Sequence, residues 1–141
     1  MKSSSFSQGK YKKDFVILHK LLGMKLLLIT LLSLMLSGNV TFDKTTHDFG
    51  TITLKDGPQS CTFTLSNNSD EPVTIFAVIS TCGCTDVTWT RESIAPGQKG
   101  EIKATYSNDE GAYPFNKALT VYTSYQKKPI RLNIKGVVSK K

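Results

Sequence analysis

The stretch from Cys61 to Asp70 reads CTFTLSNNSD, and it sets the expectation for the whole fold. Apolar Cys61, Phe63 and Leu65 alternate with hydroxyl residues, as they do when one face of a β-strand is buried and the other is solvated. The next residues, NNSD after Leu65-Ser66, all favour turns. The stretch therefore predicts a half-buried strand that ends in a reversal of the chain.

Segments on both sides of this stretch show the same period of two, and no window has the spacing of an amphipathic helix. Residues 73–79 (VTIFAVI) are almost wholly apolar, which predicts a central strand covered on both faces. Residues 95–98 (APGQ) have the preferences of a type II turn. Further strands are expected at 85–90, 102–106, 119–123 and 130–138, with 40–42 and 49–53 as a broken first strand. About seven strands at this spacing indicate an all-β chain with an immunoglobulin-like β-sandwich.

The charge of the chain is concentrated near its N-terminus. The 141 residues include 18 Lys and Arg against 11 Asp and Glu, a net charge of +7. Residues 1–40 hold six lysines and one aspartate, so residues 41–141 hold 12 basic and 10 acidic residues and carry only +2. Lysine pairs at 127–128 and 140–141 are weaker than the basic surface of a nucleic-acid-binding protein. We therefore expect no nucleic-acid partner.

Residues 26–36 read LLLITLLSLML, an apolar run near the N-terminus. The run is shorter than the roughly 20 residues of a transmembrane helix and is typical of a secretory signal peptide. We expect a signal peptide over 24–38 and a sandwich domain over 39–141, periplasmic or secreted, with membrane contact only through an uncleaved signal segment. Residues 1–23 are then either a basic leader or an artefact of the start site. A lipid anchor is not expected, because Asn39 stands where a lipoprotein carries cysteine.

Short motifs follow one another in a fixed order between residues 41 and 138. They are Phe42-Asp43, 47–52 (HDFGTI), 62–67 (TFTLSN), 71–75 (EPVTI), 82–85 (CGCT), 94–97 (IAPG), 100–102 (GEI), 115–117 (FNK) and 134–136 (IKG). In this order they resemble the bacterial family called domain of unknown function 1573. The resemblance implies a secreted or periplasmic immunoglobulin-like domain, common in the Bacteroidetes, with no known activity. The chain departs from the family pattern at Cys61 and at Asn39.

The cysteines, Cys61, Cys82 and Cys84, are the most chemically distinctive residues of the sequence. A bond between Cys82 and Cys84 would close a small, strained ring and would be easily reduced. A bond from Cys61 to either of them is expected if their strands end at the same end of the sandwich. Two alternatives stay open. All thiols are free with Cys61 packed in the core, or the Cys82/Cys84 pair carries redox or metal chemistry.

Other candidate site residues give weaker signals. Cys61 and His47 are the possible third ligands of a metal at the cysteine pair, but we expect His47 to be a solvated strand residue. The acidic pairs 70–71 and 109–110 fall in predicted turns and are expected to be solvated. The sequence has no phosphate-binding glycine loop and no Gly-x-Ser-x-Gly motif. We therefore expect no catalytic residues, no cofactor and no metal site.

Two functions follow from these patterns. The leading hypothesis is a noncatalytic extracytoplasmic module that binds a protein or a cell-envelope component, because the edge strands of a sandwich can accept an added strand. The alternative is a thiol redox or copper-handling protein that acts through Cys82 and Cys84. The sequence does not identify the partner.

Overall fold

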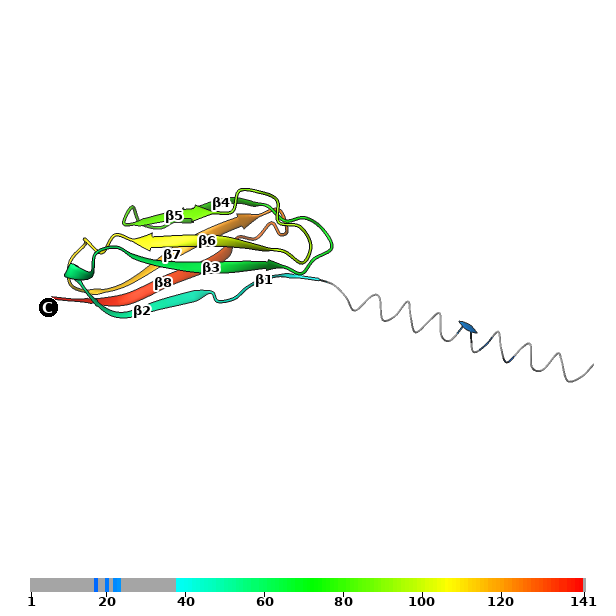
Figure 1. Ribbon diagram of the computed structural model, residues 1–141, viewed down its shortest axis with the longest axis horizontal. Coiled ribbons are helices and arrows are strands. Elements are labelled where there is room, and N and C mark those ends of the chain that lie inside the picture. Colours follow the sequence, from blue (N-terminus) through cyan, green and yellow to red (C-terminus); the bar gives the residue numbers. More distant parts are fainter. Residues whose placement is uncertain (1–16, 18–19, 21, 24–37, 141) are drawn as a thin grey trace, which may run out of the picture. The chain divides into compact units, whose positions relative to one another are not determined.

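The computed structural model describes residues 17, 20, 22–23 and 38–140. Apart from those first four positions and Gly38, the expected leader (1–23) and signal peptide (24–38) lie outside the described residues. The domain consists of strands (Figure 1) and one short 3-10 helix, η1 (Leu54–Asp56). The strands are β1 (Val40–Phe42), β2 (Thr46–Thr53), β3 (Gln59–Asn67), β4 (Ile75–Ser80), β5 (Thr85–Trp89), β6 (Lys99–Tyr106), β7 (Pro114–Thr123) and β8 (Ile130–Ser139).

The eight strands form a two-layer sandwich. One sheet has the order β1-β3-β6-β5 and the other has the order β2-β8-β7-β4. The core lies between them, where Phe63 of β3 pairs with Ile102 of β6 and Leu119 of β7 pairs with Leu132 of β8, and all four side chains are fully buried. The apolar positions that alternate in the sequence thus face the other sheet, as the period of two requires. The predicted all-β sandwich is confirmed.

The predicted broken first strand is in fact two strands in different sheets. β1 pairs antiparallel with β3, whereas β2 pairs with β8 and runs parallel to it. The chain crosses between the layers after Asp43, whose amide donates to the carbonyl of Thr64 and whose carboxylate accepts from the Thr64 amide at 2.8 Å. These are the last hydrogen bonds between this segment and β3, and the chain then continues into the other sheet. This crossing explains why the structure has eight strands and not about seven.

The apolar stretch 73–79 does not form a central strand. Val73 makes only an isolated bridge to Ile94, and the strand that follows, β4, lies at the edge of its sheet with β7 as its one neighbour. Phe76 and Ile79 therefore point outward and are 62% and 55% exposed. The prediction failed because an apolar residue pattern shows what a strand could bury, and not whether a neighbouring layer covers it.

The turn before β6 has the predicted type II conformation. The amide of Gln98 donates to the carbonyl of Ala95 at 3.0 Å, and Gly97 has a φ of 76°. A positive φ at the third position is the feature that selects glycine in this turn. The turn leads into β6 in register with β3, with Ser66 opposite Lys99.

Candidate functional site

The Cys82-Gly83-Cys84 segment carries the chain from β4 in one sheet to β5 in the other. Ser80 at the end of β4 fixes the start of this turn, because its hydroxyl donates to the Cys82 carbonyl at 2.9 Å and accepts from the Cys82 amide at 3.3 Å. The far side is fixed by the Ser107 amide, which donates to the Cys84 carbonyl at 2.9 Å. The turn is therefore anchored to its own strand and to the end of β6.

Cys82 and Cys84 are joined by a disulfide, with their Cα atoms 5.2 Å apart. The amide of Cys84 donates to the sulfur of Cys82 at 3.0 Å, and the hydroxyl of Thr85 lies 3.7 Å from the sulfur of Cys84. Both cysteines are half-buried, and Cys84 packs against the edge of the core. The disulfide thus lies at one end of the sandwich, where the two sheets are connected.

The expected bond from Cys61 to Cys82 or Cys84 is wrong. Cys61 pairs with Ala104 on β6, and Ala104 pairs in turn with Val87 on β5. The intervening strand β6 places β3 and β5 about 10 Å apart, which is more than the roughly 7 Å that a disulfide tolerates between Cα atoms. Cys61 is a free, buried cysteine with 7% of its surface exposed.

Burial makes Cys61 a packing residue and not a nucleophile. Removal from water raises the pKa of the Cys61 thiol from 9.0 to about 11, because loss of hydration costs the charged thiolate far more free energy than it costs the neutral thiol. The thiol is therefore protonated at neutral pH, and its side chain belongs to the core cluster. Such a buried thiol is chemically inert.

We expect the raised pKa of Cys61 to make the domain less stable at alkaline pH. The unfolded thiol loses its proton near pH 9 and the folded thiol only near pH 11, so the unfolded state binds fewer protons in this range and stability falls as the pH rises. The loss attributable to Cys61 is about 2 to 3 kcal/mol between these limits. Urea unfolding at a series of pH values checks this against Cys61→Ala, which should show a shallower decline. Parallel curves for the two chains would contradict the prediction.

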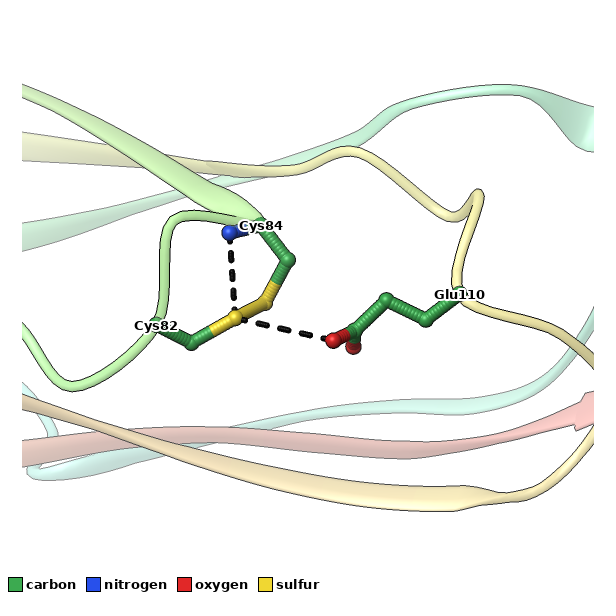
Figure 2. A group of neighbouring side chains, drawn as sticks. All are labelled: Cys82, Cys84 and Glu110. Atoms are coloured by element: carbon green, nitrogen blue, oxygen red, sulfur yellow. Dashed lines mark hydrogen bonds between the residues drawn. A yellow bond between two sulfur atoms is a disulfide. The ribbon is translucent and has the colours of Figure 1, made fainter.

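Glu110 extends from the loop between β6 and β7 toward the disulfide (Figure 2). Its Oε1 lies 3.7 Å from the sulfur of Cys82. Its Oε2 is bound by Lys117 Nζ at 2.7 Å and by the hydroxyl of Tyr106, which donates at 3.4 Å. The hydrogen bond from Lys117 is the main cause of a lowered pKa of Glu110, with a smaller contribution from Tyr113. The carboxylate is therefore ionised at neutral pH, with one oxygen facing the disulfide.

Cys82, Cys84 and Glu110 are also the described residues that could together hold a metal ion. Their ligand atoms lie within 4.8 Å of one another. Metals bind thiolates and not a disulfide, so these residues could bind a metal only after reduction. His47 is not part of this group. It lies on β2, at the opposite edge of its sheet from β4, and its ring contacts Phe49 edge-on at 4.6 Å.

A second candidate site lies on the outer face of the sheet β2-β8-β7-β4, at its β4 edge. Tyr122 of β7, 38% exposed, lies on the strand next to Phe76 and Ile79 of β4. Phe76, Tyr122 and Tyr125 line one shallow hollow together with Lys127. We call Phe76, Ile79, Tyr122 and Tyr125 the β4 patch. Contiguous exposed apolar surface of this kind is typical of an interaction site.

A known protein family matches most of the chain. The family model described as "Protein of unknown function (DUF1573)" matches residues 40–138. The chain belongs to this family. The match runs from the start of β1 into β8 and confirms the resemblance drawn from the short motifs. None of the curated proteins compared with the chain matches it.

Solved structures share the fold of this DUF1573 domain. A protein of unknown function from Porphyromonas gingivalis W83 has a TM-score of 0.61 at 17% identity, over 72% of this chain and 47% of that one. SSP-19, an MSP-domain protein like family member in Caenorhabditis elegans, has a TM-score of 0.52 at 13% identity, over 69% of this chain and 98% of that one. The secreted serine protease VesC from Vibrio cholerae has a TM-score of 0.54 at 12% identity, over 74% and 23%. The chain thus spans less than half of the Porphyromonas protein, and these likenesses concern the fold.

Sequence reasoning missed two features of the DUF1573 domain, the contact of Glu110 with the disulfide and the exposed β4 patch. Asp109 and Glu110 are both exposed in the loop, as expected of turn residues, but the carboxylate of Glu110 also contacts the sulfur of Cys82 and Lys117, whereas Asp109 accepts from the hydroxyl of Ser107. No local pattern could have connected Glu110 with cysteines 26 to 28 positions earlier. The β4 patch did leave a signal, because its strand is apolar at every position that faces outward.

The described part of the DUF1573 chain contains no helix with the length and apolar character needed to cross a membrane.

Proposed function

We propose that this domain is a noncatalytic extracytoplasmic binding module whose partner is an extended protein segment that pairs with β4 and covers the β4 patch. The observation that carries the proposal is an uncharged edge strand, IFAVIS, with two large apolar side chains exposed on its outer face. An edge strand presents unpaired backbone donors and acceptors that a second strand can satisfy. Alternating side chains of the added strand would then contact the patch.

The other edges of the two sheets are less suited to such pairing. β1 has only three residues. β2 has an irregular register after Asp48, whose carboxylate pairs with Lys135 at 3.3 Å. β5 presents an exposed acidic residue, Asp86. Short length, irregular register and charge are the devices by which proteins protect edge strands from pairing. β4 has one irregularity, between Ile75 and Ala77, and its last four residues pair regularly with β7.

The chemistry of the hollow favours a partner segment that is apolar and acidic. The hollow is lined by aromatic and small polar residues, and its one charged residue is Lys127. Arg131 is exposed on β8, opposite Thr120 of β7. Aromatic side chains with a polar end are common at protein interfaces, and the two cations favour a carboxylate in the partner. We therefore propose a protein segment as the occupant, and not a glycan or a nucleic acid.

The location outside the cytoplasm is part of the proposal. Its support is the apolar run at residues 26–36, which has the length and flanking residues of a signal peptide. In that setting an uncharged edge strand would meet other envelope proteins or their unfolded segments.

Photocrosslinking tests the proposed binding surface. The full chain, with a photoreactive phenylalanine analogue at Phe76, is produced in the cells that naturally make it and irradiated there. We expect one discrete product that joins the chain to another protein, with the crosslinked peptide of the partner identified by mass spectrometry. Phe76 suits the experiment because its side chain is largely exposed and lines the hollow.

The control places the same analogue at Lys103, an exposed position on β6 in the other sheet. We expect no such product from Lys103. The same product from both positions, or no product from Phe76, would contradict the proposed surface. A product made only of two copies of the chain would contradict a heterologous partner.

A further inference from the structure

We propose that the Cys82–Cys84 disulfide is a thiol–disulfide exchange site for a dithiol protein, in which Glu110 makes the two sulfurs chemically unequal. This inference is independent of the proposed binding function, because it concerns the turn between β4 and β5 and not the outer face of the sheet. It rests on the small ring, on the access to the turn and on the contact with Glu110.

The disulfide spans too few residues to act mainly as a structural crosslink. Cys82 and Cys84 are separated by two positions in the sequence, and the stabilisation from closing a loop decreases as the loop becomes shorter. The turn is already fixed by Ser80 and by the amide of Ser107. The fold therefore has other means of holding this segment, and the bond is free to open and close.

A partner can reach the bond from the solvent side. Gly83, the residue between the two cysteines, is exposed, and a Cβ built on it would meet no other atom within 4 Å. Both cysteines are half-buried: Cys84 packs against the core, and Glu110 lies beside the sulfur of Cys82. An exposed tip without a side chain leaves room for the thiol of another protein.

Glu110 acts on one sulfur more than on the other. Its Oε1 contacts the sulfur of Cys82 at 3.7 Å, while Lys117 and Tyr106 bind its Oε2. In the disulfide the sulfur of Cys82 carries no hydrogen, so this contact is not a hydrogen bond. After reduction the thiol of Cys82 can donate to Oε1. A negative charge beside a sulfur disfavours its thiolate, so Cys84 is the better leaving group. The other ionisable side chain at this carboxylate is that of Tyr113.

The exchange then runs in two balanced steps. A thiolate of the partner attacks the sulfur of Cys82, the Cys82–Cys84 bond breaks, and its electron pair passes to Cys84, which takes a proton from water. The second thiolate of the partner attacks the partner sulfur of this mixed disulfide and releases Cys82 as a thiolate, which takes a proton from water and then donates to Glu110. The two thiols of the partner give their protons to water when they form thiolates, so in sum the partner loses two electrons and two protons and is left with a disulfide, and this chain gains two electrons from the partner and two protons from water.

Glutathione serves as the probe for the first part of the test. The full chain is incubated with excess reduced glutathione at neutral pH, and its thiols are counted by alkylation and mass spectrometry. We expect Cys82 and Cys84 to be reduced together, to reoxidise together when oxidised glutathione is added, and to form a mixed disulfide at Cys82. Cys61 should stay unmodified until the chain is denatured. A bond that resists glutathione, or a mixed disulfide at Cys84, would overturn the proposal.

Glu110→Gln tests the second part in a chain that also carries Cys84→Ala, so that Cys82 is the reactive thiol. Removal of the negative charge should lower the pKa of Cys82 by about one unit and raise its alkylation rate at pH 7 about tenfold. Asp109→Asn, the neighbouring carboxylate in the same loop, should change the rate less than twofold. Glu110→Ala repeats the test without a hydrogen-bonding side chain, and circular dichroism verifies that each variant is folded. Equal rates with and without Glu110 would overturn its role.

Discussion

Replacement of Asn67 by alanine should lower the free energy of unfolding by about 3 kcal/mol or more, although the change removes only one polar side chain. Asn67 ends β3 and is fully buried. Its Nδ2 donates to the carbonyls of Glu71 at 2.8 Å and Ile94 at 2.9 Å, and its Oδ1 accepts from the amide and the hydroxyl of Ser69.

The expected loss is large because alanine removes four hydrogen bonds of a fully buried side chain and leaves the Ser69 amide without a partner, whereas the carbonyls of Glu71 and Ile94 each keep one bond, from the Ser69 hydroxyl and the Val73 amide. Each unsatisfied buried group costs about 1 to 3 kcal/mol, and small domains have only about 5 to 15 kcal/mol of stability in total. The side chain of Asn67 also connects the loop before β4 to Ile94, close to the type II turn. Its removal should therefore loosen the end of the sandwich opposite the disulfide turn.

Urea unfolding monitored by circular dichroism measures the effect. The matched control is Asn68→Ala, because Asn68 is exposed and its side chain makes one hydrogen bond, to the hydroxyl of Thr41 at 3.2 Å. We expect the control to lie within about 0.5 kcal/mol of the natural chain. Equal losses at the two positions would show that burial and the four hydrogen bonds of Asn67 do not determine the stability of this loop.

Replacement of Ile79 by lysine, unlike that of Asn67 by alanine, should have little effect on stability and a large effect on binding. Ile79 is 55% exposed on the outer face of β4, so a charge there disturbs no core contact and should change the free energy of unfolding by no more than about 0.5 kcal/mol. Within an interface, the same lysine would be desolvated against apolar surface. We expect the affinity for the crosslinked partner to fall about 30-fold or more, as at an interface hot spot.

Val137→Lys is the matched control for Ile79→Lys. Val137 is 43% exposed and lies on the same sheet, but on β8 in pairing with Thr51 of β2, away from the β4 edge. Titration calorimetry of the purified chain with the partner should give an unchanged affinity for this variant. A loss of affinity as large as that of Ile79→Lys would mean that the whole face, and not the β4 patch, carries the binding.

The strands whose apolar residues alternate could be predicted from the sequence. The order of the strands in each sheet, and therefore which strands lie at an edge, could not. β3, β6 and β8 appeared in the alternation because each has one buried and one solvated face. The edge position of β4 could not be derived, since a residue pattern does not state which strand lies beside another. The same limit explains why the expected Cys61 bond was wrong. In the sheet β6 lies between β3 and β5, and this order cannot be derived from a residue pattern.

Only part of the candidate site could be predicted from local sequence patterns. The spacing of Cys82 and Cys84 identified them as candidates for a bond with each other or for redox or metal chemistry, but it did not exclude a bond to Cys61. Glu110, by contrast, comes to the disulfide only because the loop between β6 and β7 closes the same end of the sandwich, and Lys117 then holds its carboxylate from β7. The contact therefore depends on three segments that are distant in the sequence, and the fold had to be known first.

Amide hydrogen exchange on the complex with the crosslinked partner tests the central claim, that β4 is the binding edge. In the free chain, the amides of β4 that point away from β7 have no partner strand and should exchange quickly. On binding, we expect slower exchange at residues 76–80 with unchanged exchange at the edge strands β1, β2 and β5. Protection at one of those other edges, with β4 unchanged, would contradict the account.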